Sequence, residues 1–225
     1  MTDTIARKID HTQLKPEVTK DSIKKLCKEA KTKKFASVCI NPFFVSLASN
    51  LLRKSKIKVC AVIGFPLGAN KTEIKILETQ EAIKDGASEI DMVINIGALK
   101  AGDYDYVKND IEGVVEVAKG YSEDIIVKVI IETGLLTEEE KIQICKKIKE
   151  TRADFIKTST GFNTKGATVN DVKLLKRCIG KNSKLKIKAS GGIRTYEKAK
   201  ELLDAGAERL GTSSGVEILK NKKKR

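Results

Sequence analysis

The sequence is poor in several residues on which whole classes of proteins depend. Its 225 residues include no tryptophan, one histidine and three prolines, and aromatic residues make up only 4%. So few aromatic side chains leave no obvious platform on which nucleic-acid bases could stack. Because His11 is the single histidine, a histidine-based metal site is not expected either.

Long apolar runs and paired cysteines are also missing. No apolar run approaches the ~20 residues that a membrane span needs, and residues 1–8 lack the apolar core of a signal peptide. The five cysteines are odd in number and have no CxxC spacing, which argues against a disulfide framework or a zinc ribbon. We therefore expect a cytoplasmic protein in a reducing compartment, with no membrane partner.

Positive charge is abundant, with a formal net charge of +14. This excess makes a nucleic-acid-binding protein an alternative to be weighed. The lysines are spread through every segment, however, and only the end of the chain, residues 220–225, forms a dense basic cluster. We interpret the charge as a lysine-rich surface that attracts anionic metabolites, and we expect no nucleic-acid partner.

A strand-then-helix unit recurs eight times, at about 28 residues per unit, as a (β/α)8 barrel requires. The expected strands are 6–11, 36–40, 57–63, 89–95, 125–132, 154–159, 185–190 and 208–211. The expected helices include 22–31, 42–52, 72–84, 104–118, 138–149, 170–177 and 196–205. The prediction is an α/β protein with one TIM-barrel domain over residues 1–219, followed by a basic tail, 220–225, that we expect to be disordered. A doubly wound open sheet is the rival fold.

Three of these strands carry an ionisable side chain amid apolar residues, near the end of the strand: Asp91, Lys157 and Lys188. Side chains alternate across a strand, so Asp91 shares a face with Asn95, Lys157 with Ser159, and Lys188 with Ser190. Active sites of (β/α)8 barrels lie at the C-terminal ends of the strands. The pattern predicts that two amines and a carboxylate converge there.

Glycine and hydroxyl residues follow the seventh and eighth strands, where this fold often binds phosphate. Glycines let backbone N–H groups approach an anion, and the helix N-terminus that follows attracts negative charge. The candidate phosphate-binding residues are Gly161, Gly191, Gly192, Arg194, Gly211, Ser213 and Ser214. Arg194 could instead face solvent.

Seven segments together resemble the deoxyribose-phosphate aldolase family. They are 9–16, 38–42, 62–68, 89–97, 128–134, 155–162 and 187–194, and the likeness runs from Ile5 to about Leu219 in the order expected. The most specific segments are 155–162 and 188–194. The chain departs from the family pattern at Gln13, where an apolar residue is commoner, and at its end, where lysines replace a tyrosine found in some members.

The resemblance implies reversible cleavage of 2-deoxy-D-ribose 5-phosphate to glyceraldehyde 3-phosphate and acetaldehyde, without metal or cofactor. It gives Lys157 the Schiff-base role and gives Asp91 and Lys188 acid–base roles, whereas the residues alone do not rank Lys157 above Lys188. An iminium on the lysine takes up the electrons of the broken C–C bond, and a second ammonium nearby disfavours the charged form of that lysine.

Several residues and alternatives stay open at this stage. Thr12, Cys39 and Lys128 are candidates for the pocket, although Cys39 could simply pack in the core and Lys128 could form a structural ion pair with Glu132 or Asp91. His11 is expected to be a hydrogen-bonded core residue. A homodimer is a hypothesis. Another Schiff-base phosphosugar aldolase is the second candidate function.

Overall fold

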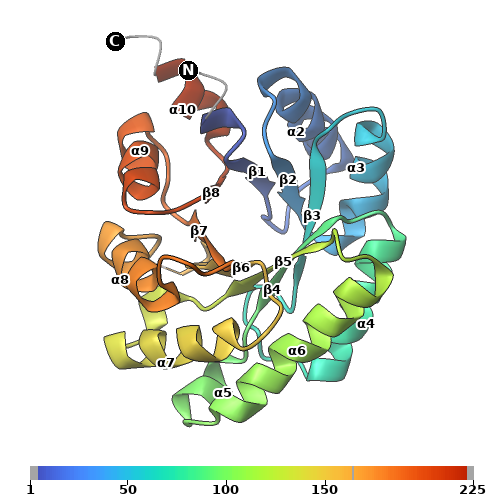
Figure 1. Cartoon of the computed structure of the whole chain (residues 1–225). Coiled ribbons are helices and arrows are strands. Elements are labelled where there is room, and N and C mark those ends of the chain that lie inside the picture. The colour runs from blue at the N-terminus through green and yellow to red at the C-terminus, as the bar shows by residue number, and fades with distance from the viewer. Residues whose placement is uncertain (1–4, 164, 222–225) are drawn as a thin grey trace.

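Eight parallel strands close into a barrel in the computed structural model, which describes residues 5–163 and 165–221 (Figure 1). Each strand pairs with the next along the chain, and β8 pairs with β1 to complete the barrel. The strands are β1 (Ile9–Gln13), β2 (Ser37–Ile40), β3 (Lys58–Ile63), β4 (Glu89–Val93), β5 (Ile126–Ile130), β6 (Phe155–Lys157), β7 (Lys186–Ser190) and β8 (Arg209–Thr212). The closed barrel confirms the predicted fold and excludes the open sheet.

Helices surround the barrel as an outer ring (Figure 1). They are α2 (Lys20–Lys33), η1 (Pro42–Phe44), α3 (Val45–Leu52), α4 (Thr72–Lys84), α5 (Ile96–Lys100), α6 (Tyr104–Tyr121), η2 (Thr133–Leu135), α7 (Glu138–Lys149), α8 (Val169–Ile179), α9 (Tyr196–Asp204) and α10 (Gly215–Asn221). The predicted bounds of α4 and α7 are confirmed. Helix α7 begins at a capping box in which Thr137 and Glu140 satisfy each other's backbone N–H groups.

The structure differs from the sequence-based expectation at several element bounds: β4 and β6 end earlier than expected, at Val93 and Lys157, and the expected helix 42–52 is divided into η1 and α3. Strand β1 begins at Ile9 rather than at residue 6, because its partners on β2 and β8 pair only with residues from Ile9 onward. Helix α5 was not predicted, since five residues are too few to show helical periodicity, and α10 is the eighth helix that the repeating unit implied without bounds. Lys220 and Asn221, placed in the expected tail, belong to α10, and residues 222–225 lie outside the described residues.

The main hydrophobic core lies between the strands and the helices. Ile90 and Met92 of β4, for example, are fully buried in the cluster that also contains Val107 and Ile111 of α6. Amphipathic helices with a strong apolar stripe, such as α8 and α9, cover the strands in this way. Within the described residues, every helix is too short or too polar to cross a bilayer.

The barrel interior is filled differently, by layers of side chains from alternate strands. Strand alternation assigns Ser37, Glu89, Phe155 and Arg209 to the lowest layer, Asp10, Cys60, Lys128 and Lys188 to the next, and Cys39, Asp91, Lys157 and Gly211 to the layer above. Most of these residues are polar or charged, yet they are largely buried. A charged interior is costly unless its charges are paired, so the pairing within these layers decides what the barrel can do.

A buried ion pair in the helical layer braces the end of β4. Lys75 of α4 donates to Asp110 of α6 at 2.5 Å and to the carbonyl oxygen of Val93 at 2.9 Å. Both charged side chains are fully buried. Since Val93 ends β4 two residues after Asp91, this pair fixes the strand end that carries the carboxylate.

Candidate active site

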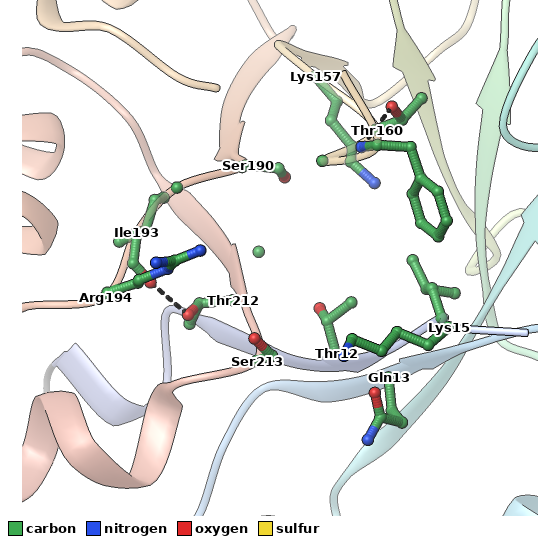
Figure 2. A pocket seen from close by; sticks show the side chains of 16 residues that line it. Thr12, Gln13, Lys15, Lys157, Thr160, Ser190, Ile193, Arg194, Thr212 and Ser213 are labelled. Carbon is green, nitrogen blue, oxygen red and sulfur yellow. Dashed lines mark hydrogen bonds between the residues drawn. The ribbon is translucent and has the colours of Figure 1, made fainter. Parts of the chain in front are cut away.

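A pocket of about 440 Å³ opens at the C-terminal ends of the strands. Figure 2 shows Lys157 on one side of it, facing Ser190, Arg194 and Ser213 across the cavity, with Thr12 and Lys15 at its edge. The predicted residues that line it are Thr12, Lys157, Gly161, Gly191, Gly192, Arg194, Gly211 and Ser213. Asp91, Lys188, Lys128, Cys39 and Ser214 are not among the lining residues.

Asp91 is the centre of a buried cluster just below the pocket. Its Oδ2 accepts hydrogen bonds from Lys157 Nζ at 2.6 Å and from Lys188 Nζ at 2.7 Å. Its Oδ1 accepts from Lys128 Nζ at 2.8 Å. Strands β4, β5, β6 and β7 therefore bring together the predicted carboxylate and two predicted amines, together with a third amine from Lys128.

The three lysines differ in their access to the pocket. Lys128 and Lys188 are completely buried, whereas Lys157 is 2% exposed and is the one of the three that lines the cavity. A nucleophile has to reach its substrate, so geometry now ranks Lys157 above Lys188. The residues alone had left that choice open.

Burial and charge act against each other within the cluster. Burial raises the pKa of Asp91, but attraction to Lys128, Lys157 and Lys188 outweighs burial and holds the pKa well below its usual range. Burial likewise lowers the pKa of Lys188, and attraction to Asp10 and Asp91 overcomes it, so the net shift is upward. Lys188 therefore stands beside Lys157 as an ammonium, the neighbour that the sequence suggested.

Lys128 forms ion pairs rather than facing the cavity. Besides Asp91, its Nζ lies 2.7 Å from Glu89 Oε2 and 3.9 Å from Asp10 Oδ2. The alternative pairing with Glu132 does not occur among the described residues. Cys39 is also buried, with its Sγ 3.9 Å from Asp91 Oδ2, and it packs with Leu14, Cys60 and Val62.

The opposite wall of the pocket is made of the two glycine-containing loops after β7 and β8. Gly191 and Gly192 have φ values of 88° and 73°, a backbone region that favours glycine. A Cβ on Gly211 would lie 2.5 Å from Ser190 Oγ, so a larger residue there would force the Ser190 side chain to move. Thr212 Oγ1 ties the loops together by donating to the carbonyl oxygen of Ile193 at 2.6 Å, a contact visible in Figure 2.

These loops have the features of an anion site. Arg194 supplies a cation and Ser190 and Ser213 supply hydroxyls around the cavity, and the hydroxyl oxygen of Ser190 is buried without a hydrogen-bond partner among the described residues. Ser214 lies just outside, where its N–H donates to Thr212 Oγ1 at 2.9 Å. A phosphate group would find its donors on the side of the pocket opposite Lys157.

Known proteins share both the sequence and the fold. The family model for DeoC/LacD family aldolases matches residues 4–222. Deoxyribose-phosphate aldolase of Thermoanaerobacter sp. (strain X514) is 59% identical over 215 residues, covering 96% of this chain and 95% of that protein. The Clostridium tetani protein of the same name is 56% identical, covering 97% and 99%. The deoxyribose phosphate aldolase of Aeropyrum pernix, described as a tetramer, superimposes with a TM-score of 0.92 at 34% identity, covering 99% and 92%.

The chain belongs to the DeoC/LacD aldolase family. The resemblance inferred from the sequence is thereby confirmed, and the protein is a lyase of the aldolase type. For an aldolase, a pocket with an amine at one end and an anion site at the other fits a phosphorylated sugar.

Asp10 is a residue of the aldolase site to which the sequence analysis gave no role. It is completely buried, and its Oδ2 lies 2.5 Å from Lys188 Nζ while its Oδ1 accepts from Ser37 and Arg209. The pattern that identified Asp91, an acidic residue within an apolar strand, was also present in Ile9-Asp10-His11. His11 is confirmed as a hydrogen-bonded core residue, with Nε2 2.8 Å from Glu29.

Glu132 is a second buried carboxylate, which the sequence analysis named only as a possible partner of Lys128. It has a left-handed backbone with φ 53°, and its Oε2 accepts from the hydroxyl and the backbone N–H of Thr160, which lines the pocket. A non-glycine residue in this conformation is uncommon and often lies at a functional site. No pattern of residue types predicts the left-handed backbone of Glu132, because that conformation depends on how the loops after β5 and β6 pack.

An apolar wall completes the pocket. The rings of Phe65 and Phe162 meet edge to face at 5.2 Å, and Leu14 and Phe162 line the cavity. The sequence analysis gave Phe162 no role. In the structure its side chain is 51% exposed, which is unusual for a large aromatic residue. The aldolase pocket is thus polar on the side of the glycine loops and apolar beside Phe162.

Proposed function

We propose that this aldolase reversibly cleaves 2-deoxy-D-ribose 5-phosphate to D-glyceraldehyde 3-phosphate and acetaldehyde through a Schiff base on Lys157. The observation that carries the proposal is the position of Lys157, the one amine bonded to Asp91 that also lines the pocket. The names of the relatives in Thermoanaerobacter and Clostridium tetani support the choice of substrate.

The reaction proceeds by taking electrons into the iminium. Neutral Lys157 Nζ adds to the C1 aldehyde, and loss of water gives the iminium. Removal of the proton from the C3 hydroxyl breaks the C2–C3 bond, releases glyceraldehyde 3-phosphate and leaves an enamine. Protonation at C2 and addition of water then release acetaldehyde and restore the amine.

Asp91 and Lys188 serve the proton transfers in this scheme. The two groups share a hydrogen bond of 2.7 Å next to Lys157, so a proton can move between them and the reacting nitrogen, directly or through water. Lys128, bonded to the other carboxylate oxygen, holds the Asp91 side chain in place. Thr12 and Cys39 are given no chemical step.

The phosphate of the substrate is proposed to bind at Gly161, Gly191, Gly192, Arg194, Gly211, Ser213 and Ser214. Backbone N–H groups, hydroxyls and the guanidinium of Arg194 provide the donors. Binding energy from this remote group helps to orient the reacting carbon, and unphosphorylated deoxyribose should therefore react far more slowly.

A coupled assay with purified protein, deoxyribose 5-phosphate and a chelator tests the proposal. We expect equal amounts of glyceraldehyde 3-phosphate and acetaldehyde, at a rate that the chelator does not change. The second candidate, a Schiff-base aldolase with a larger donor, would release a different carbonyl product and no acetaldehyde. The absence of turnover on deoxyribose 5-phosphate would contradict the assignment.

We also propose a cytoplasmic homodimer as the working form. All five cysteines are free, as expected in a reducing compartment. A relative described as tetrameric supports self-association in the family, and sedimentation would distinguish a dimer from other states.

A further inference from the structure

Six charged side chains inside the barrel form a closed ring of ion pairs, which we call the ionic ring. In order, the pairs are Arg209–Glu89 at 3.0 Å, Glu89–Lys128 at 2.7 Å, Lys128–Asp91 at 2.8 Å, Asp91–Lys188 at 2.7 Å, Lys188–Asp10 at 2.5 Å and Asp10–Arg209 at 2.6 Å. Cations and anions alternate around it. Three positive and three negative charges make the ring electrically neutral.

Lys157 is a seventh ionisable group attached to this ring at one point. Its ion pair in the described part of the chain is with Asp91 Oδ2, an oxygen that Lys188 already occupies. A protonated Lys157 therefore adds one unpaired positive charge to a buried, balanced set. Because an uncompensated buried charge is costly, charge balance favours the neutral amine at this position.

The other members of the ring hold their charges. Burial lowers the pKa of Lys128, yet attraction to Asp91 and Glu89 brings it well above its ordinary value. Burial also opposes the charge of Arg209, and attraction to Asp10 and Glu89 raises its pKa again. The ring thus keeps its alternating charges, and Lys157 contacts it through the single oxygen Asp91 Oδ2.

We propose that Glu89 and Arg209, in the lowest layer of the barrel, are positioning residues that set the pH range in which Lys157 reacts. The inference rests on the proposed function, since it takes Lys157 as the Schiff-base amine. Neither residue lines the pocket. Glu89 is linked to Asp91 through Lys128, and Arg209 is linked to Asp91 through Asp10 and Lys188.

Other ionisable groups face the barrel interior or the pocket, and the variants described below leave these residues unchanged. The barrel strands contribute Asp10, Cys39, Lys58, Cys60, Asp91, Lys128, Lys186 and Lys188, and the pocket loops contribute Lys15, Glu132 and Arg194. Lys58 and Lys186 are exposed, so solvent screens them. Burial raises the pKa of Cys60 well above its ordinary value, which keeps this thiol neutral.

The two residues should have opposite effects. Glu89→Gln removes a negative charge and leaves a surplus of positive charge, so Lys157 should lose its proton more readily and react at lower pH. Arg209→Gln removes a positive charge, so Lys157 should keep its proton and react only at higher pH. A unit charge about 10 Å away in a protein interior corresponds to a shift of about one pH unit.

The experiment measures the initial rate of irreversible trapping against pH. Acetaldehyde condenses with the amine and releases water, and hydride from cyanoborohydride then reduces the C=N bond to a secondary amine. We expect the midpoint of the profile to move down by about one pH unit in Glu89→Gln and up by about one in Arg209→Gln. The double variant is again balanced and should return to the wild-type midpoint, as should the charge-conserving Arg209→Lys.

Structural damage cannot imitate this pattern, because it would lower the rate without moving the midpoint in opposite directions. Glu123→Gln and Arg152→Gln, which break an exposed ion pair, are the matched controls and should leave the midpoint unchanged. Unshifted or equally signed midpoints in the two single variants would overturn the inference. If neither single variant folds, a shifted midpoint in the folded double variant would overturn it, and an unshifted one would support it. Failure of wild-type trapping at Lys157 would instead overturn the proposed function.

Discussion

The two faces of β4 show how one strand serves two different ends. Ile90 and Met92 point outward and are buried among apolar helix residues, whereas Glu89 and Asp91 point into the barrel and are buried among lysines. The outward face contributes free energy of folding through burial of apolar surface. The inward face gives up that contribution, since apolar residues of similar size would often be as stabilising as buried ion pairs. In return, the inward face contributes charged side chains whose balance, in the inference above, favours the neutral and reactive form of Lys157.

The largest loss of activity is expected when the reacting amine on the inward side is removed. Lys157→Met should abolish trapping and lower turnover by more than the about 10²–10⁴-fold typical of losing an acid–base group, because no covalent intermediate can form. The variant should still fold, since the ionic ring is intact without Lys157. Steady-state kinetics with circular dichroism checks both points, with the exposed Lys54→Met as control. Turnover within tenfold of wild type would remove Lys157 from the mechanism.

Breaking the ring itself should affect stability. Asp10→Asn removes one ion-pair partner from both Lys188 and Arg209 and leaves the buried ring with one surplus positive charge, so it should cost about 3–5 kcal/mol at pH 7, measured by urea unfolding.

The same variant tests the pH dependence of stability. Burial raises the pKa of Asp10, but Lys188, Arg209 and Lys128 hold it below its ordinary value, so its contribution is present above about pH 4 and is lost as pH falls. Asp10→Asn should therefore have a shallower loss of stability between about pH 5 and pH 2. If the free energy of unfolding fell equally steeply with pH in the wild type and in Asp10→Asn, this account of the ring would be contradicted.

A substitution on the outward face of β4 should lower stability without changing the pH dependence of the reaction. Met92→Ala leaves a cavity between β4 and the helices and should cost about 2–5 kcal/mol in the free energy of unfolding. Because Met92 lies in the apolar cluster on the outward face of β4, the folded variant should keep the wild-type pH profile. A displaced profile would mean that the two faces of the strand are not independent.

The smallest expected effect concerns the anion site. Arg194→Met should raise KM for deoxyribose 5-phosphate by roughly tenfold, the magnitude of one charged hydrogen bond. It should leave kcat/KM for unphosphorylated deoxyribose unchanged, since that substrate has no phosphate to bind. Equal losses for both substrates would place the anion site elsewhere.

Much of this molecule follows from local pattern. Alternation along the strands predicted that Asp91, Lys157 and Lys188 face one another, and recurring strand–helix units predicted the barrel. The ring could not be predicted in the same way, because Asp10 and Arg209 are 199 positions apart and meet only when β8 pairs with β1. The left-handed Glu132 and the short helix α5 also depend on packing rather than on residue type.

The central claim is that Lys157 is the reacting amine and that Lys188 remains a charged partner. Borohydride reduction in the presence of deoxyribose 5-phosphate, followed by proteolysis and mass spectrometry, tests it most directly. We expect a single secondary-amine adduct on the peptide containing Lys157, and none on the peptides containing Lys128 or Lys188. An adduct on Lys188 would contradict the account, because that side chain is buried and paired with Asp10 and Asp91.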